Sequence, residues 1–156
     1  MKNLTSWLCA YVATLGPVGY LPAPGTMGTL CALPLLGGLR KLQMHMGYID
    51  ESLLVVGSIF LAVWVIDQAL EQIGAHDPSE IVLDEVVGFI VTMMFFPLKV
   101  PVLVIGFFYF RLFDIIKPFG IQGLESIRGG WGIVLDDLAA ALVARLALHI
   151  TLKFFL

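Results

Sequence analysis

The chain has 156 residues, of which 59% are hydrophobic and 13% are charged, and its formal net charge at pH 7 is −3. An ordinary soluble domain is about 45–50% apolar and about 25% charged, so this composition favours a membrane protein with a single domain over residues 1–156. The small negative charge and the lack of a basic run argue against a nucleic-acid partner, and Cys9 and Cys31 have no metal-binding or redox spacing.

Six apolar stretches are predicted to be helices, because each is bounded by helix-breaking or charged residues. In chain order they are 4–20, 26–39, 52–70, 80–97, 100–116 and 131–154. No clear cleavage site follows the first stretch, so we expect the N-terminus to be retained. The second ends at Arg40 and Lys41, and it is shorter than the ~20 residues that a membrane span needs, so we expect a half-helix or an oblique helix. The predicted fold is all-α: a compact multi-helix integral membrane bundle of five to six apolar helices, including short or half-helices.

Five carboxylates are predicted to gather near one face of the membrane. If the last three predicted helices cross in alternating directions, Asp84 and Glu85 lie near the start of the first, Asp114 near the end of the second, and Asp136 and Asp137 near the start of the third. Like charges that lie close together repel and raise one another's pKa, so such a cluster needs a counter-charge. If the earlier helices also cross, the segment 22–26 and Asp67 reach the same face.

The cations near this cluster are too few to balance it. Arg111 and Lys117 flank Asp114 on one predicted helix face, and Arg128 follows in the next loop. Carboxylate oxygens are hard ligands, so we expect a divalent cation such as Mg²⁺. Taken singly, each motif also suits a purely structural role: Asp84 and Glu85 suit the first turn of any helix, and the charges around Asp114 suit a structural ion ladder.

A small ion or proton transporter is the competing function, because intramembrane carboxylates also mark transport pathways. Transporters often contain two related halves with interrupted helices. No internal repeat is evident here, and the carboxylates are expected near one face. These features favour a hydrolytic site that faces the membrane surface.

Four motifs resemble those of the phosphatidylglycerophosphatase A family of bacterial membrane phosphatases. They are PGTMGTL (24–30), DPSEIVLDEVVGF (77–89), FRLFDIIKP (110–118) and GGWGIVLDDLAAAL (129–142). Their order and spacing make the resemblance specific, and it runs from about residue 22 to residue 142. Where the family usually has Trp, Ser, Pro and Gly, this chain has Leu83, Thr29, Gly120 and Ala141, and none of these departures removes a carboxylate.

The resemblance implies a Mg²⁺-dependent hydrolysis of phosphatidylglycerophosphate to phosphatidylglycerol and inorganic phosphate. It also implies a multi-pass protein of the bacterial inner membrane with its active site facing the cytoplasm. The positive-inside rule does not support that orientation, because Arg40, Lys41 and Lys99 would lie on the opposite face. The oligomeric state stays open.

The motif positions imply which residues act in the reaction. The catalytic and metal-binding residues would be the five carboxylates, Asp84, Glu85, Asp114, Asp136 and Asp137, and Asp77 also matches a motif position. The substrate phosphate would be bound by Arg111, Lys117 and Thr26. The sequence does not choose between one and two metal ions, or between water and a covalent carboxylate as the nucleophile.

Overall fold

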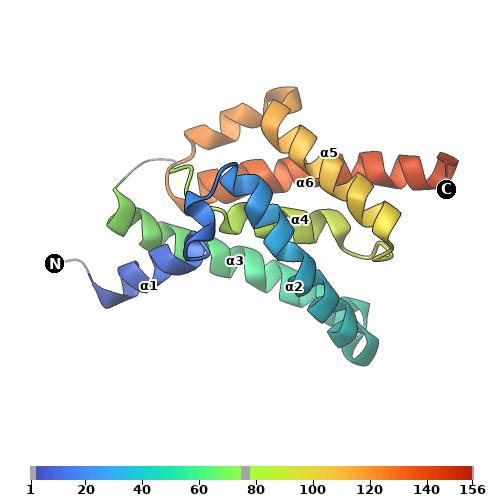
Figure 1. Cartoon of the computed structure of the whole chain (residues 1–156), viewed down its shortest axis with the longest axis horizontal. Coiled ribbons are helices and arrows are strands. Elements are labelled where there is room, and N and C mark those ends of the chain that lie inside the picture. Colours follow the sequence, from blue (N-terminus) through green and yellow to red (C-terminus); the bar gives the residue numbers. More distant parts are fainter. Residues whose placement is uncertain (1–2, 75–77, 156) are drawn as a thin grey trace.

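The computed structural model describes residues 3–74 and 78–155, and all regular structure within these residues is helical (Figure 1). The all-α prediction is therefore confirmed. The elements are α1 (Leu4–Ala13), η1 (Val18–Tyr20), α2 (Pro24–Met46), α3 (Tyr48–Ile73), α4 (Leu83–Met93), α5 (Val100–Ile116), η2 (Pro118–Ser126) and α6 (Gly130–Phe155), where η marks a 3-10 helix.

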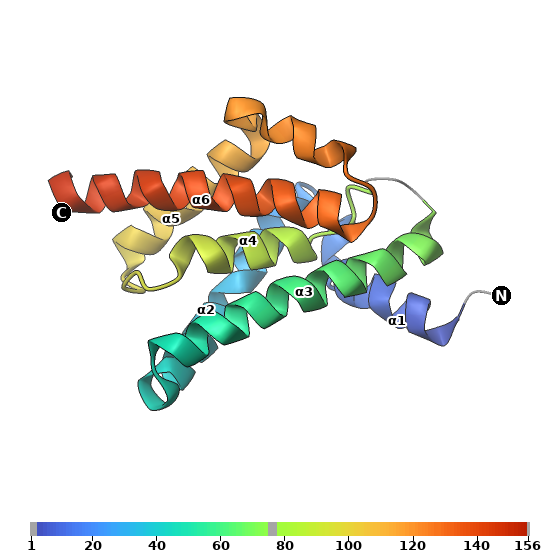
Figure 2. The same cartoon turned by 180° about the vertical axis from the view of Figure 1, so that it is seen from behind.

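Helix α4 lies at the centre of the bundle and contacts α2, α3, α5 and α6, as both views of the fold show (Figures 1 and 2). Its residue Phe89 is fully buried and packs against Phe110 and Phe107 of α5, with ring centroids 6.0 Å apart in both pairs. Helix α1 lies along α3. Because α4 has only 11 residues, it is too short to span a membrane.

Two predicted helices are longer than the observed ones. Helix α1 ends at Ala13 instead of residue 20, because the chain turns there: Leu15 and Gly16 have positive φ angles of 48° and 62°. Helix α4 covers only part of 80–97, and the chain leaves it through Phe95, whose φ angle is 68°. In both places, turn residues end a helix inside an apolar run that hydropathy alone reads as continuous.

Of the two alternatives predicted for 26–39, a half-helix and an oblique helix, the half-helix was wrong. Helix α2 has 23 residues, includes Pro34, and continues through Arg40 and Lys41. A long charged side chain does not stop a helix when its charged group can reach a polar partner. Here the Arg40 guanidinium donates a hydrogen bond to the carbonyl of Phe96.

The other predictions agree closely with the structure. The stretch 52–70 lies inside α3, 100–116 coincides with α5, and 131–154 lies inside α6. The segment predicted as an irregular break after α5 contains η2. The start of α4, the end of α5 and the start of α6 therefore follow one another along the chain as predicted.

Within the described residues, one helix is long and apolar enough to cross a membrane, namely α3. Helix α1 is a shorter apolar helix. Length and composition alone are weak signs of a membrane span, so the multi-pass bundle stays a prediction.

Candidate functional site

The first turn of α4 carries Asp84 and Glu85. The N–H of Val82, just before the helix, donates a hydrogen bond of 3.0 Å to the carbonyl of Ala13, which fixes the start of α4 against the end of α1. Asp84 is 8% exposed, and the side chain of Glu85 is 14% exposed. Negative charge in a first helical turn is favoured by the helix dipole, which lowers the cost of burying both groups.

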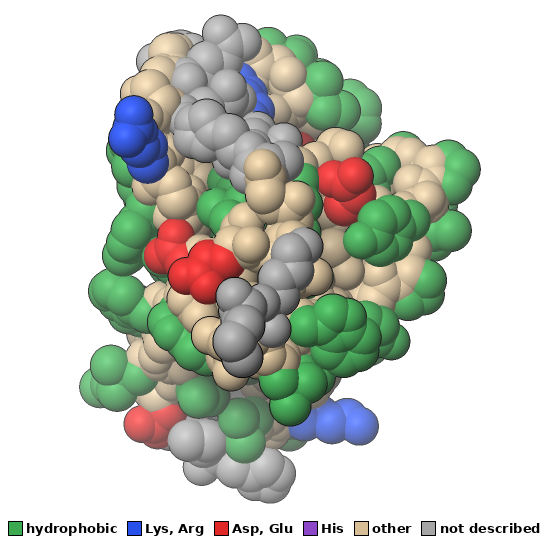
Figure 3. Space-filling model, turned by 90° about the vertical axis from the view of Figure 1, so that its left-hand side faces the viewer, with side chains coloured by type: hydrophobic (Ala, Val, Ile, Leu, Met, Phe, Trp, Pro, Cys, Tyr) green, Lys and Arg blue, Asp and Glu red, His purple; other side chains and the backbone are tan. Residues whose placement is uncertain are grey.

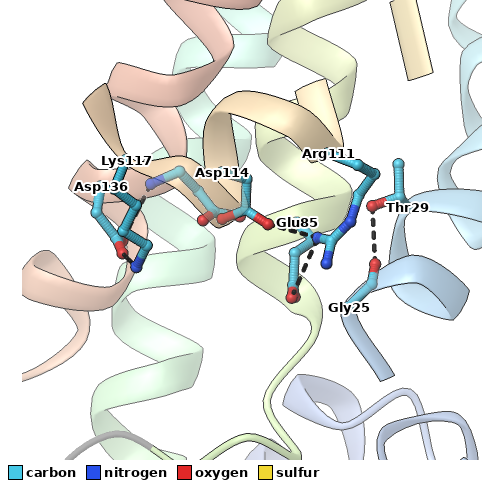
Figure 4. A network of polar contacts seen from close by, with 8 residues as sticks. Gly25, Thr29, Glu85, Arg111, Asp114, Lys117 and Asp136 are labelled. Carbon is cyan, nitrogen blue, oxygen red and sulfur yellow. Dashed lines mark hydrogen bonds and ion pairs between the residues drawn. The ribbon is translucent and has the colours of Figure 1, made fainter. Parts of the chain in front are cut away.

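Arg111 connects α5 to α4. Its Nη1 atom lies 2.6 Å from Oδ2 of Asp114, one turn along α5, and 3.7 Å from Oε1 of Glu85 (Figure 4). The predicted ion pair between Arg111 and Asp114 is therefore present. It is also part of a wider network, because the same guanidinium reaches a carboxylate on a second helix.

Lys117 connects the end of α5 to α6. Its backbone has a positive φ angle of 48°, which is uncommon for a residue other than glycine, and its N–H donates to the carbonyl of Phe113. Its Nζ atom donates a hydrogen bond to Oδ2 of Asp136 (Figure 4). A residue in this conformation is held by its surroundings, and strained backbone of this kind is often found at functional sites.

Asp136 and Asp137 lie two turns into α6 and are both buried, with 6% and 3% exposure. The two neighbours have different surroundings. Asp136 pairs with Lys117, whereas Asp137 lies beside the two carboxylates of α4.

Asp84, Glu85 and Asp137 form a group of carboxylates that fits a metal ion. One oxygen from each lies within 4.8 Å of the others. Three buried oxygens of this trio have no hydrogen-bond partner: Oδ1 of Asp84, Oε2 of Glu85 and Oδ2 of Asp137. Buried polar atoms are normally paired, and carboxylate oxygens are the ligands that Mg²⁺ prefers. The residues present therefore fit a hard divalent cation.

The pKa values at the start of α4 reflect this crowding. Burial raises the pKa of Asp84 well above its ordinary value, and the negative charge of Glu85 adds to the shift. Burial likewise raises the pKa of Glu85 to about 7, with a further upward contribution from Asp114 and an opposing one from Arg111. At both groups, burial outweighs the interactions that favour the charged form of the carboxylate.

The charged side chains surround one cavity of about 290 Å³. Seven charged side chains line it, and they come from α4, from α5 with the residue that follows it, and from α6. They are Asp84, Glu85, Arg111, Asp114, Lys117, Asp136 and Asp137. Pro24 and Gly25 of α2 complete one wall, and residues of the segment 127–133 complete another. The structure therefore brings together all five predicted carboxylates and two predicted phosphate contacts, and their roles in the reaction stay predictions.

Of the other predicted site residues, Thr26 is not among the described residues that line the cavity. Thr26 is half-buried one residue beyond Gly25. Asp77 lies outside the described residues.

Thr29, one of the departures from the family pattern, is fully buried and donates a 2.8 Å hydrogen bond to the carbonyl of Gly25 (Figure 4). A serine hydroxyl makes the same kind of bond, so this departure is conservative.

Sequence reasoning missed the close approach of α2 to the charged network. A Cβ atom at Gly25 would overlap Oε1 of Glu85 and lie 2.9 Å from both terminal nitrogens of Arg111. The glycine in the PGT motif was a visible signal, but its reason is a contact between three helices that the sequence does not show.

Comparison with known proteins identifies relatives of this chain. The family model described as Phosphatidylglycerophosphatase A matches residues 11–152. A protein named Phosphatidylglycerophosphatase A from Escherichia coli is 33% identical over 123 residues, covering 78% of this chain and 69% of the relative. The protein of that name from Haemophilus influenzae is 34% identical over 125 residues, covering 79% and 75%.

A third relative has a different name. A Putative phosphatidylinositol-3-phosphatase from Bacteroides thetaiotaomicron is 33% identical over 140 residues, covering 86% of this chain and 87% of the relative. No solved structure matches this chain.

The carboxylate trio generates a prediction about stability. We expect Asp137→Asn to stabilise the metal-free protein by about 1–3 kcal/mol, because it removes one of three mutually repelling buried charges. In a chain of this size, each kcal/mol corresponds to a rise of about 2–4 °C in unfolding temperature. Thermal unfolding of the purified chain in metal-free detergent solution measures the change.

Asp136→Asn is the matched control, because it removes a neighbouring charge that is paired with Lys117. This change should lower the unfolding temperature or leave it unchanged. If both variants are destabilised to the same extent, the trio does not repel as the geometry indicates.

Proposed function

This chain belongs to the phosphatidylglycerophosphatase A family, and from that premise we propose that it hydrolyses phosphatidylglycerophosphate to phosphatidylglycerol and inorganic phosphate. The observation that carries the proposal is the cavity, where five carboxylates and two cations meet from three helices. Hydrolysis of a phosphate monoester needs both kinds of group, since cations bind the phosphate and carboxylates bind metal or accept protons.

The size of the cavity supports a small phosphorylated headgroup as the part that is bound. Its volume of about 290 Å³ lies just below the usual range for ligand pockets, about 300–1,000 Å³. Acyl chains would not fit there together with the phosphate. In the proposed complex they stay in the lipid beside the helices.

We also propose that Mg²⁺ binds at the trio of Asp84, Glu85 and Asp137. The unpaired buried oxygens of these residues support that assignment. When bound, the ion supplies charge neutralisation on the phosphate and a more acidic water. Asp114 and Asp136 lie at the edge of this group, where each holds a cation in place.

The chain's own cations bind and orient the phosphate in the proposed mechanism. The guanidinium of Arg111 has five N–H donors, and its buried Nε has no hydrogen-bond partner, so the group retains donors for phosphate oxygens. Lys117 places a second positive charge at the cavity wall. Both stabilise the charge that develops on the phosphate oxygens.

The reaction itself exchanges one bond at phosphorus for another. The oxygen of a water forms a bond to phosphorus, and the bond from phosphorus to the glycerol oxygen breaks. A cavity carboxylate outside the trio, Asp114 or Asp136, accepts the proton from the attacking water and returns it to the leaving glycerol oxygen. A covalent intermediate on a carboxylate is the alternative course.

We propose that the chain is a multi-pass protein of the bacterial inner membrane with the cavity on the cytoplasmic side. Support comes from α3 and from apolar stripes that are exposed along the other long helices. On α5 the stripe contains Val100, Val104, Phe108 and Ile115, and on α6 it contains Leu142, Leu146 and Ile150. Such stripes are rarely left in water. In the end view of Figure 3, apolar side chains lie mostly toward the edges, with acidic and basic side chains between them.

Phosphate release tests the proposed function and the metal together. The purified full-length chain should release phosphate from phosphatidylglycerophosphate, a chelator should abolish release, and Mg²⁺ should restore it. Mg²⁺ should also raise the thermal unfolding temperature of the wild type and have less effect on Asp137→Asn.

Two outcomes would contradict these proposals in different ways. Full turnover by protein shown to be metal-free by elemental analysis would remove the metal role. Preferred hydrolysis of phosphatidylinositol 3-phosphate would reassign the substrate, and no release from either lipid would leave a transporter as the function that better accounts for the carboxylates.

Lys117 tests the phosphate contacts. We expect Lys117→Ala to lower kcat/KM by an amount equivalent to about 2–4 kcal/mol, because it removes a cation that stabilises the transition state. The Mg²⁺ concentration for half-maximal activity should not rise. Asp137→Asn should raise that concentration instead, so titration of Mg²⁺ against phosphate release separates the two roles.

The left-handed backbone at Lys117 calls for a second variant. Lys117→Gly removes the same side chain and suits the positive φ angle, so a loss in this variant comes from the side chain and not from the backbone. Wild-type turnover in Lys117→Gly would limit Lys117 to a structural partner of Asp136.

Gly25 tests the close approach of α2. In Gly25→Ala the new methyl group must displace the ends of the Glu85 and Arg111 side chains. Because both ends are flexible, the unfolding temperature should change little, whereas kcat/KM should fall about tenfold or more through their displacement.

Gly38→Ala is the matched control on the same helix. Apart from its chain neighbours and the backbone of its own helix, no atom of the described residues lies within 4 Å of a Cβ at that position. This variant should keep full activity and gain roughly 0.5–1 kcal/mol of stability from the better helix former. Equal activity in the two alanine variants would show that the approach at Gly25 has no role.

A further inference from the structure

Asp67 lies in α3, which contributes no side chain to the cavity wall. It is a half-buried carboxylate within the apolar stretch of that helix. Its Oδ1 atom accepts a hydrogen bond of 2.6 Å from the backbone N–H of Gly130, the first residue of α6. A side chain from one helix therefore caps the start of another, and that second helix carries Asp136 and Asp137.

The packing around this hydrogen bond leaves no room for larger residues. Gly129 has a φ angle of 80°, and a Cβ there would lie 2.5 Å from Oδ1 of Asp67. A Cβ at Gly130 would overlap the carbonyl oxygen of Val63, one turn earlier in α3. The glycine pair thus lets the start of α6 rest directly on the backbone of α3, and Figure 2 shows the two helices side by side there.

This anchor is linked to the cavity in two ways. Gly129 itself lines the cavity, so the hydrogen bond to its neighbour holds that part of the wall. Asp137 lies seven residues after Gly130, which is two turns, so both positions share one face of α6. Fixing Gly130 against α3 therefore fixes the rotation of α6 that directs Asp137 toward Asp84 and Glu85.

The start of α6 needs such an anchor. Glycine is a poor helix former, and positions 129, 130 and 132 are all glycine. The first N–H groups of a helix also have no partner within it. The carboxylate of Asp67 pairs one of these groups, and the ring of Trp131, whose centroid lies 5.6 Å from that of Phe60, also packs the first turn against α3.

We propose that Asp67 is a positioning residue of the phosphatase, which acts by holding Gly129 and Gly130 so that the cavity wall and the carboxylates of α6 keep their places. The inference rests on the proposed function. Asp67 touches neither the phosphate nor the metal in this scheme.

Two substitutions separate the acceptor oxygen from the charge. Asp67→Ala removes the acceptor and should lower kcat/KM about 10- to 100-fold, the range found when partners that orient a metal site are lost. Asp67→Asn keeps an acceptor oxygen at the same position, so it should retain activity within about threefold of wild type. Asp50→Ala, at the opposite end of α3, is the matched control for loss of a carboxylate and should retain full activity.

Hydrogen exchange gives a readout that does not depend on turnover. In the full-length chain, the amide of Gly130 should exchange at least about tenfold faster in Asp67→Ala than in wild type, and at a near wild-type rate in Asp67→Asn. The folded fraction of each variant at the assay temperature is measured by circular dichroism. A loss of activity that the folded fraction fully explains would overturn the proposal.

The other outcomes also decide the matter. Wild-type activity in Asp67→Ala, or unchanged exchange at Gly130, would show that Asp67 does not position the site. If the wild type releases no phosphate from phosphatidylglycerophosphate, the proposed function fails, and the exchange data alone then decide whether Asp67 holds the start of α6.

Discussion

The mutual repulsion of Asp84, Glu85 and Asp137 is the constraint on which the rest of the site depends. Their oxygens lie within 4.8 Å of one another in a chain that is 59% hydrophobic, where charges are poorly screened. The protein divides its five carboxylates accordingly. Asp114 and Asp136 each have a close cation, whereas among the described residues the ion pair that reaches the trio is the longer contact between Glu85 and Arg111. That imbalance is the physical reason to expect a divalent ion there.

Helix ends supply the rest of the compensation. The starts of α2, α4 and α6 all contribute residues to the cavity or lie next to it: Pro24 and Gly25, then Asp84 and Glu85, then Gly129 and Gly132. The N-terminus of a helix is the positive end of its dipole, so three such ends favour a phosphate and a cluster of carboxylates alike. This convergence also explains the glycines, because helix starts can meet so closely only where no Cβ intervenes.

The sequence predicted the arrangement of charges better than the boundaries of helices. Alternating crossings were enough to place Asp84, Asp114 and Asp137 together, because the argument needs only the order of helix ends. The predicted helix boundary was wrong at α2, where Arg40 and Lys41 suggested a break. Hydropathy cannot show that Arg40 reaches the carbonyl of Phe96.

Contacts between segments far apart in the sequence could not be predicted from the order of helix ends. The division of the carboxylates into paired and unpaired ones depends on side-chain directions, and so does the pairing of Lys117 with Asp136. The approach of Gly25 to Glu85 and the bond from Gly130 to Asp67 join residues 60 and 63 positions apart. No local pattern in the chain encodes either contact.

The position of the cavity at one end of the bundle reconciles a charged site with an apolar chain. A charge near the end of a membrane helix costs less than one at the centre of the bilayer, because water and headgroups are close. The proposed substrate also has a charged end and an apolar part, with its phosphate at the membrane surface and its acyl chains in the lipid. A small polar cavity beside exposed apolar helices therefore matches the substrate along its whole length. In the proposed complex, the site binds the phosphate without drawing the acyl chains out of the bilayer.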